Sequence, residues 1–413
     1  MIFIPMSDYL AGFRFATFLL CFFAGLAVFI IGFIPTSIHK LEPASGASLF
    51  HKCINITQSH DICQKLTQAS YPERYDHVVL IVIDALRADF IPSVSNNPEF
   101  NIKLPFIEGL IKQKKALPFI SQVHSPTVTL PRIRSLVTGG VSNFMDVIMN
   151  LNAAELKEDN VLLQAKSKNL KTVFYGDNTW LKLFPNSFTR SKGTHSFFVS
   201  DFKEVDDNVT VKMKSEFDDI DWDIMILHYL GVDHIGHSHG PLSHHLPPKL
   251  REMDNIVKFI YDSLRSKSRF HSLIVICGDH GMTSSGSHGG VSKPELLTPL
   301  IFINVNRSHN YHGVTTADQI DFASTMSVLL GLPIPANSFG NLLSGVLRYS
   351  HFDRVQTLYA MLNNLFQLFE VHKTLFTKEA EMYGERAYFP QASLKRNTKF
   401  GTFSYLPFSQ CIY

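Results

Sequence analysis

Six aspartates and histidines between residues 84 and 288 are of the types that bind transition-metal ions. They are Asp84 after the run VVLIVI, Asp233 and His237 in GVDHIGH, Asp279 and His280 in GDHG, and His288 in GSHG. Carboxylate and neutral imidazole together suit a zinc-type divalent ion, whereas a magnesium or calcium site would consist mostly of oxygen. Two such ions about 4 Å apart can hold both the attacking and the leaving oxygen of a phosphoryl transfer. We therefore expect a two-metal site that acts on phosphate esters.

The segment HSPTVTLPRIRSLVTGG supplies a candidate nucleophile, Thr129, with Thr127 as the fallback. A threonine hydroxyl is a poor nucleophile unless a metal or a base lowers its pKa. The pattern predicts Thr129 as the N-cap of a helix that has Pro131 in its first turn and stops at Gly139. At a helix N-terminus, the dipole and the free N–H groups favour both an alkoxide and a bound phosphate. The same pattern also fits a threonine that only caps a helix.

Histidine is abundant around the GVDHIGH motif. The spacing of Asp233 and His237 places them one helical turn apart or on a tight loop, so that both could bind one ion. The remaining histidines nearby are ambiguous, and we expect them to be exposed loop residues: His234, His239, His244 and His245.

The elements that must position these residues follow from five apolar, β-rich runs separated by segments of helical period. The runs are Val78–Ile83, Thr172–Tyr175, Ile224–His228, Leu273–Cys277 and Leu300–Ile303. This alternation predicts an α/β fold with a mostly parallel β-sheet sandwiched by helices. Helices are expected over Leu246 to Ser268 and in a segment that begins after Thr315 and Thr316 and stops at Gly331. Asp84, Asp233 and Asp279 follow three of the runs, so the carboxyl ends of parallel strands would bring them together.

The N-terminal part carries a membrane signal. Residues 15–34 form a charge-free apolar stretch long enough to span a bilayer, and it is longer than the apolar core of a usual signal peptide. We expect an uncleaved transmembrane signal-anchor rather than a cleaved signal peptide. Sequons at Asn55, Asn208 and Asn306 favour a luminal position for the chain beyond residue 34, where Cys53 and Cys63 could form a disulfide. With 38 basic against 36 acidic residues, the chain has no charge signature of a nucleic-acid-binding protein.

Longer motifs point to a known family. VLIVIDALR, the T-x-P at Thr129 followed by T-G, D-x-x-x-H, GDHGM and GSHG resemble the alkaline-phosphatase superfamily. PTVTLPRI, DVIMNLN, FYGDNTWLKLFP, SFFVSDFKEVDDNVT, DWDIMILHYLGVDHIGH and GLPIP resemble its GPI ethanolamine phosphate transferases, over about residues 75–340.

The resemblance implies two divalent metal ions, most readily zinc, at sites divided between seven residues. One ion would be held by Asp84, Thr129, Asp279 and His280, and the other by Asp233, His237 and His288. Thr129 would attack the phosphorus of phosphatidylethanolamine and release diacylglycerol. A mannose of a GPI-anchor precursor, expected to be the second, would then take the phosphoethanolamine. The lipid substrates, the membrane, the lumen of the endoplasmic reticulum and a possible stabilising membrane subunit are the surroundings that the resemblance implies.

The expected domain plan combines these signals. It consists of an N-terminal tail (1–14), the transmembrane signal-anchor (15–34), a luminal linker (35–76), an alkaline-phosphatase-like catalytic domain (77–345) and a C-terminal extension (346–413). The multi-span membrane region of the resembled transferases is absent from this plan, so a truncated, non-catalytic luminal partner is one alternative. A phosphodiesterase or pyrophosphatase of the same superfamily is another, because the metal ligands alone do not name the substrate. A sulfatase is excluded, since Thr129 and Ile133 stand where that class needs Cys or Ser and then Arg.

Overall fold

The computed structural model describes residues 6–33, 74–95, 97, 99–100, 102–142, 155–194, 198–267, 270–306, 313–350 and 352–383. The chain divides into two compact units, Met1–His372 and Lys373–Tyr413, and the site-bearing sheet belongs to the first.

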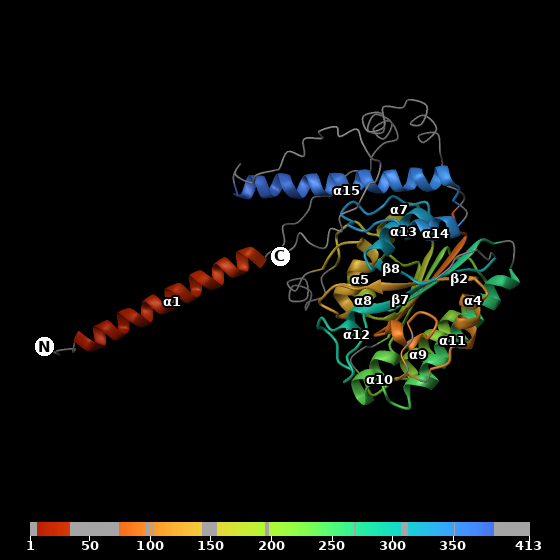
Figure 1. Cartoon of the computed structure of the whole chain (residues 1–413), viewed down its shortest axis with the longest axis horizontal. Coiled ribbons are helices and arrows are strands. Elements are labelled where there is room, and N and C mark those ends of the chain that lie inside the picture. Colours follow the sequence, from red (N-terminus) through yellow and green to blue (C-terminus); the bar gives the residue numbers. More distant parts are fainter. Residues whose placement is uncertain are drawn as a thin grey trace, which may run out of the picture. The chain divides into compact units, whose positions relative to one another are not determined.

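Eight strands form one sheet in the order β4-β3-β5-β1-β6-β7-β2-β8 (Figure 1). Their bounds are β1 His77–Ile83, β2 Ala116–Gln122, β3 Thr172–Asp177, β4 Arg190–Thr194, β5 Ile224–Tyr229, β6 Ser272–Cys277, β7 Leu297–Asn304 and β8 Thr315–Asp318. The central strand β1 pairs in parallel with β5 (Val78 opposite Ile224) and with β6 (Val78 opposite Leu273). The sheet is mixed, because β7 runs antiparallel to both β6 and β2, while the other neighbouring strands are parallel.

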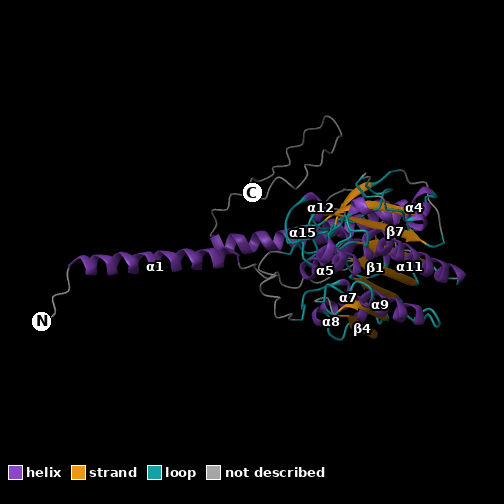
Figure 2. Ribbon diagram, turned by 90° about the horizontal axis from the view of Figure 1, so that it is seen from below, coloured by secondary structure: helices purple, strands orange, loops and turns teal. Residues whose placement is uncertain are grey.

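Helices cover both faces of the sheet, which lies between them in Figure 2. Figure 1 shows α9, α10 and α11 on one side and α7, α13 and α14 on the other. The bounds of the helices are α1 Met6–Phe33, the 3₁₀ helix η1 Ala88–Phe90, α4 Pro105–Lys112, α5 Thr129–Thr138, α7 Val161–Ser167, α8 Thr179–Leu183, α9 Glu204–Ser215, α10 Gly231–His239, α11 Leu246–Ser266, α12 Lys293–Leu296, α13 Asp321–Leu329, α14 Ser344–Tyr349 and α15 Arg354–Tyr383. The α/β class expected from the sequence is confirmed.

The central strand shows why its sequence is apolar throughout. Its odd-numbered residues Val79 and Ile81 belong to the core beneath α4, α9, α10 and α11, and its even-numbered residues Val78 and Leu80 belong to the core beneath α5, α7, α13 and α14. All seven residues of β1 are buried. A strand with both faces covered has no solvent side, so the polar alternation of a half-exposed strand is missing.

The structure corrects one expectation about a local element and confirms another. Thr315 and Thr316 are residues of strand β8 and do not begin a helix; the helix α13 begins at Asp321. The side chain of Asp321 accepts a hydrogen bond from the backbone N–H of Asp318, so the turn between strand and helix is set by an aspartate. The helix expected over Leu246 to Ser268 is present as α11, which ends at Ser266.

Within the described residues, no helix combines the length and the apolar character needed to cross a membrane. The span expected over 15–34 runs beyond the described part of the chain at residue 34, and it stays a prediction. Asn55 and the expected pair Cys53 and Cys63 also lie outside the described residues. The two other sequon asparagines, Asn208 and Asn306, are exposed.

Candidate metal centre

Three neighbouring strands deliver the acidic residues of the site. Asp84 directly follows β1, Asp279 follows β6, and Asp233 lies in the first turn of α10, which begins just after β5. Because β1 lies between β5 and β6, the carboxyl ends of all three strands meet at one edge of the sheet. The backbone N–H of Asp84 donates to the carbonyl of Tyr229 at 2.9 Å, which continues the ladder between β1 and β5 into the site.

The helix α10 holds Asp233 and His237 one turn apart, with His237 Nε2 3.4 Å from Asp233 Oδ1. The start of this helix is anchored by Asp206 of α9, whose Oδ1 accepts hydrogen bonds from the N–H groups of Leu230 and Gly231. A Cβ at Gly231 would lie 2.3 Å from Asp206 Oδ2, so only glycine allows this approach. The helix and its two ligand candidates are therefore fixed from the neighbouring helix.

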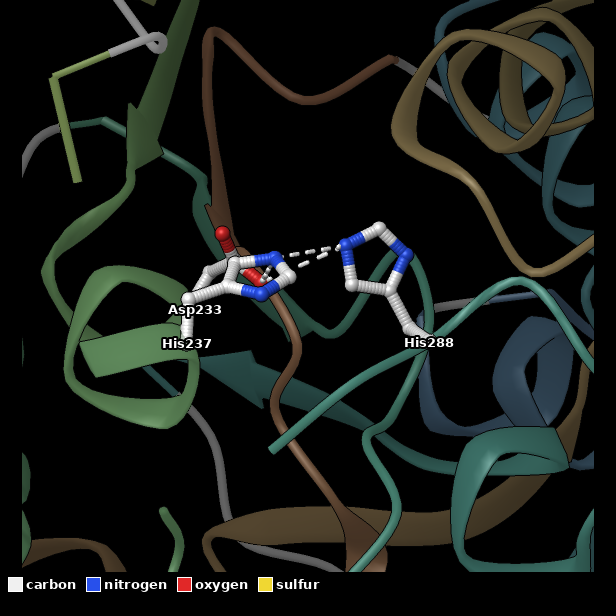
Figure 3. Close-up of side chains that lie close together, drawn as sticks. All are labelled: Asp233, His237 and His288. Atoms are coloured by element: carbon white, nitrogen blue, oxygen red, sulfur yellow. Dashed lines mark hydrogen bonds and ion pairs between the residues drawn. The ribbon is translucent and has the colours of Figure 1, made fainter. Parts of the chain in front are cut away.

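His288 completes this first group from the loop between β6 and β7. Figure 3 shows its ring facing Asp233 and His237, with His288 Nε2 3.0 Å from His237 Nε2 and 3.6 Å from Asp233 Oδ1. One ligand atom from each of the three residues lies within 4.8 Å of the others, which makes them a group that could hold a metal ion. His237 is exposed, so this group opens to solvent.

Thr127 orients His288. The Nδ1 of His288 lies 2.9 Å from the carbonyl oxygen of Thr127, which can only accept, so Nδ1 carries the hydrogen and Nε2 offers a lone pair. The hydroxyl of Thr127 donates to Gly290 O at 3.0 Å and accepts from the N–H of Gly289. Thr127 is fully buried, and these contacts occupy its hydroxyl on the side of the loop.

A second, deeper group forms around Asp84. His280 Nε2 lies 3.4 Å from Asp84 Oδ1 and 3.4 Å from Asp279 Oδ2, and its Nδ1 donates to the carbonyl of Gly281. Thr129 Oγ1 lies 3.4 Å from Asp84 Oδ2 and 3.4 Å from His280 Nε2. Asp84, Asp279 and His280 are buried, whereas Thr129 is half-buried. The rings of His280 and His288 stack with centroids 4.1 Å apart, so the two groups are adjacent.

Thr129 does not cap its helix as expected. It is the first helical residue of α5, the N-cap is Val128, and the cap makes no side-chain hydrogen bond. The hydroxyl of Thr129 turns instead toward Asp84 and His280. The expected stop at Gly139 is confirmed, because this glycine adopts the left-handed conformation (φ 68°) at the C-cap. The seven residues expected at the site thus lie together in two adjacent groups.

The turn after β1 carries backbone strain at the site. Ala85 has a φ of 56°, an uncommon left-handed conformation for a residue with a Cβ. Its N–H donates to Asp279 Oδ1 at 3.2 Å, so this conformation joins the turn after β1 to the segment after β6. Strained backbone of this kind persists where its surroundings hold it, and it clusters at functional sites.

The carboxylates present the donor atoms that a cation needs. Asp84 Oδ1, Asp233 Oδ1 and Asp279 Oδ2 are buried and have no hydrogen-bond partner. Burial raises the pKa of Asp84 well above its ordinary value, and the nearby carboxylates of Asp279, Asp233 and Asp177 raise it further. Unpartnered, mutually repelling oxygens beside bare imidazole nitrogens fit divalent cations, which would offset that repulsion.

Two histidines differ from what the sequence predicts. His228, at the end of β5, was missed, and its Nε2 lies 3.5 Å from Asp84 Oδ2 in the buried group. A polar residue inside the apolar run IMILHY is the signal that could have identified it. His234 was expected to be exposed, but it is buried, and its Nδ1 lies 2.6 Å from the carbonyl of Asp201.

A cavity of about 620 Å³ is lined by the segments that follow the ligand motifs. Pro241 and Leu242 come shortly after α10, and Thr283 and Ser284 come between His280 and His288. Arg87, three residues beyond Asp84, also lines the cavity and makes two hydrogen bonds to Asp89. The lining therefore combines hydroxyl and charged groups with apolar side chains.

Comparison with known proteins agrees with this geometry. Two curated relatives are similar: human GPI ethanolamine phosphate transferase 2, catalytic subunit, is 40% identical over 359 residues, covering 80% of this chain and 34% of that protein. GPI ethanolamine phosphate transferase 2 of Aspergillus fumigatus is 43% identical over 288 residues, covering 65% of this chain and 37% of that protein. The chain thus spans about a third of the length of these relatives. The resemblance expected from the motifs is confirmed.

Structural comparison finds the same type of fold. A solved 2-O GAG sulfatase superposes with a TM-score of 0.51 at 14% identity, covering 68% of this chain and 76% of that one, and this likeness concerns the fold alone. Residues 78–298, which run from β1 to the start of β7 and include all seven ligand candidates, match the type I phosphodiesterase / nucleotide pyrophosphatase family profile. A match that covers more than half of the sequence and the whole candidate centre places the chain in the type I phosphodiesterase / nucleotide pyrophosphatase family.

Proposed function

We propose that this chain transfers phosphoethanolamine from phosphatidylethanolamine to a mannose of a GPI-anchor precursor, the second mannose being the expected acceptor. One observation carries the proposal: the half-buried hydroxyl of Thr129 lies 3.4 Å from both Asp84 and His280, at the first turn of α5. The names of the relatives support transfer of ethanolamine phosphate in the context of a GPI anchor.

Divalent ions, zinc by the type of the ligands, would be held at the two groups. Asp84, Thr129, Asp279 and His280 would hold one ion, and Asp233, His237 and His288 the other. When bound, these ions would supply Lewis acidity, which lowers the pKa of the threonine hydroxyl and neutralises charge on the phosphoryl oxygens.

The proposed reaction has two steps that pass through a phosphoryl-threonine. In the first, Thr129 Oγ1 forms a bond to phosphorus as the bond from phosphorus to the diacylglycerol oxygen breaks; Thr129 releases its proton and diacylglycerol takes one up. In the second, a mannose hydroxyl oxygen bonds to phosphorus, releases its proton and displaces Thr129, which is protonated again. The N-terminal amides of α5 lie beside Thr129, where they favour the phosphoryl charge.

The test is to trap the adduct with phosphatidylethanolamine labelled in its ethanolamine, without acceptor, and to locate the label by mass spectrometry. The wild-type chain should carry phosphoethanolamine on Thr129, Thr129→Ser should retain a labelled residue there, and Thr129→Ala should have none. Thr127→Ala, the matched control, should still be labelled at Thr129, because its hydroxyl bonds to the loop at Gly289 and Gly290 while the backbone carbonyl that contacts His288 is kept. A label on Thr127 in the Thr129→Ala variant would move the nucleophile, and an unlabelled wild-type chain with its metal bound would refute the proposal.

The surroundings belong to the same proposal. The described side chains of α1 include exposed Phe15, Phe18, Leu20 and Phe22, which suit a hydrocarbon environment, and both substrates are lipids. We place the chain at the endoplasmic reticulum membrane with its sheet in the lumen. The human relative is named a catalytic subunit, so a stabilising membrane subunit is part of the proposal. Protease protection of sealed microsomes tests the luminal placement, and cleavage in the exposed loops of the sheet-bearing domain without detergent would refute it.

We assign the acceptor sugar to the cavity of about 620 Å³, whose lining includes hydroxyl and charged groups that can hydrogen-bond a glycan and apolar side chains that can pack against its rings. Leu242 is exposed at this cavity, so Leu242→Trp should narrow it. The variant should raise the KM for the acceptor while leaving adduct formation on Thr129 unchanged. Val211→Trp, at an exposed position of α9 away from the cavity lining, is the control. An unchanged acceptor KM in Leu242→Trp would refute this assignment.

A second candidate function is hydrolysis, because the matched family is described as a phosphodiesterase and pyrophosphatase family. Water would then replace the mannose in the second step and release free phosphoethanolamine. Adding acceptor discriminates the two: under transfer the label moves to the glycan, and under hydrolysis it appears in solution at the same rate with or without glycan. A folded chain on which no label forms would favour the non-catalytic partner.

A further inference from the structure

His228 stands apart from the other histidines of the centre in how its ring is held. It is fully buried at the end of β5, and the indole N–H of Trp180 donates to its Nδ1 at 3.0 Å. An indole nitrogen can only donate, so Nδ1 of His228 must be the acceptor. The neutral ring therefore carries its single hydrogen on Nε2.

The two other buried or half-buried rings of the metal centre have the opposite arrangement. His280 and His288 each direct Nδ1 at a backbone carbonyl, of Gly281 and Thr127, and so carry the hydrogen there. Their Nε2 atoms keep a lone pair directed at the carboxylates. The hydrogen-bond partner of Nδ1 thus selects the tautomer of each ring. It places the hydrogen on Nε2 in His228 and on Nδ1 in His280 and His288.

This difference decides what His228 does. Its Nε2 lies 3.5 Å from Asp84 Oδ2, close enough to count among atoms that could surround an ion with Asp84 and Asp279. A neutral imidazole nitrogen that carries hydrogen has no lone pair for a metal. We propose that His228 is a positioning residue that directs its N–H at Asp84 Oδ2 and leaves Asp84 Oδ1 free for the metal. The proposal rests on the metal centre of the proposed function.

The surroundings of Asp84 agree with this division of its two oxygens. Oδ1 has no hydrogen-bond partner and lies 3.4 Å from the bare Nε2 of His280. Oδ2 lies 3.4 Å from the hydroxyl of Thr129 and 3.5 Å from Nε2 of His228, a buried nitrogen that has no hydrogen-bond partner of its own. A donor on one oxygen fixes the rotation of a carboxylate, so the other oxygen is presented in one direction.

The neighbouring strand keeps the ring of His228 in place. A Cβ added to Gly176 of β3 would lie 2.4 Å from the carbonyl oxygen of His228 and 2.6 Å from its Cβ, so β3 lies directly against this residue. Trp180, in the helix α8 that follows β3, is fully buried, and its ring packs against that of Phe174 with centroids 5.4 Å apart. The indole therefore has a fixed position from which to select the tautomer.

The direct test is long-range ¹H–¹⁵N NMR of the metal-free chain labelled in histidine, with the His228 signals assigned by their loss in His228→Gln. We expect the pattern of an Nε2–H ring with a bare Nδ1. A ring with hydrogen on Nδ1 would overturn the proposal, and so would a His228 Nε2 resonance that shifts like a metal ligand when zinc is added.

Zinc affinity, measured by competition with a chelator and without substrate, is the second readout. Loss of such an outer partner typically weakens metal binding by about 10–100-fold. Trp180→Phe keeps an aromatic ring but frees the tautomer, and His228→Leu removes the donor; both should weaken zinc by at least tenfold. His228→Gln, which keeps an N–H donor, should lose less zinc affinity than His228→Leu. Equal affinity in all variants would refute the role.

Two controls distinguish a variant that does not fold from a wrong proposal, and failure of this proposal from failure of the proposed transfer. Thermal unfolding of each variant shows whether the fold survives, and an Nε2–H ring in folded Trp180→Phe would show that the indole does not select the tautomer and overturn that part. A wild-type chain that binds zinc but forms no adduct on Thr129 would contradict the proposed transfer and leave the role of His228 standing. A folded wild-type chain that binds no zinc would overturn both.

Discussion

Replacing Asp206 with alanine tests whether α9 anchors the metal-bearing helix. Asp206 is fully buried; its Oδ1 accepts from the N–H groups of Leu230 and Gly231 at 2.9 and 3.1 Å, and its Oδ2 lies 3.1 Å from Lys249 Nζ. The Lys249 side chain is only 4% exposed, and its other partner is Glu252 at 2.9 Å. Alanine would leave a buried ammonium with one partner and remove the acceptor for both amides.

The expected loss follows from these contacts. Removing one member of a buried ion pair costs about 3–5 kcal/mol, and an unsatisfied buried amide costs about 1–3 kcal/mol. Because one side chain makes both interactions, the costs overlap, and we expect Asp206→Ala to lower the free energy of unfolding by about 4 kcal/mol. The double variant Asp206→Asn with Lys249→Met keeps an acceptor for the amides and leaves no buried charge. It should stay within about 1 kcal/mol of wild type.

Denaturant titration followed by tryptophan fluorescence measures this, because the two tryptophans, Trp180 and Trp222, are both buried. Zinc binding at the group of Asp233, His237 and His288 should weaken in Asp206→Ala and recover in the double variant. Glu252→Gln, which changes only the half-exposed partner, is the control with little effect. A loss below about 1 kcal/mol in Asp206→Ala, or an equal loss in the double variant, would refute the anchoring role.

Two further predictions concern backbone space and pH. Gly286→Ala should lower the free energy of unfolding by about 1–3 kcal/mol and weaken zinc binding, because the added Cβ would lie 1.9 Å from the carbonyl oxygen of Gly236. Gly313 also has a positive φ, but an added Cβ there would meet no other atom, so Gly313→Ala should show only the smaller conformational cost. Equal losses of stability in the two variants would contradict a clash at Gly286. Burial raises the pKa of Asp321 from 3.8 to about 6. The folded state binds this proton more tightly than the unfolded state does, so protonation of Asp321 adds roughly 3 kcal/mol to the free energy of unfolding. This contribution is complete below pH 3.8 and is lost as the pH rises through about 6. Asp321→Asn should remove this pH dependence of unfolding, and identical pH profiles would exclude Asp321 as its source.

The central strands were predictable because burial on both faces makes them apolar throughout. The missed strands lack this signal: β4 reads RSKGT at one edge of the sheet, and β8 reads TTAD at the other. The strand β2 contains Pro118, which cannot donate to a ladder. Its pairing with β8 begins only at Phe119, so Pro118 lies where β2 has no β8 partner. The antiparallel direction of β7 likewise leaves no mark in its own residues.

The candidate site was predictable where chemistry and strand ends coincide. Asp84, Asp233 and Asp279 follow apolar runs, so a parallel sheet alone implied that they converge. Side-chain tautomers and helix anchors depend on residues far apart in the sequence, such as Trp180 for His228 and Asp206 for Gly231. The sequence contains these residues, but nothing in their spacing shows which partner each one meets.

The position of β1 has a consequence for how the chain folds during synthesis. It is made before the strands that flank it, and Val78 pairs with Ile224 and Leu273, so both of its edges wait for residues far downstream. Until then, an entirely apolar strand has two unpaired edges, the kind of segment that aggregates. Pairing over such long sequence separations is also slow. We therefore expect nascent chains to depend on chaperones until β6 is complete, and substitutions in β1 to reduce yield before they affect chemistry.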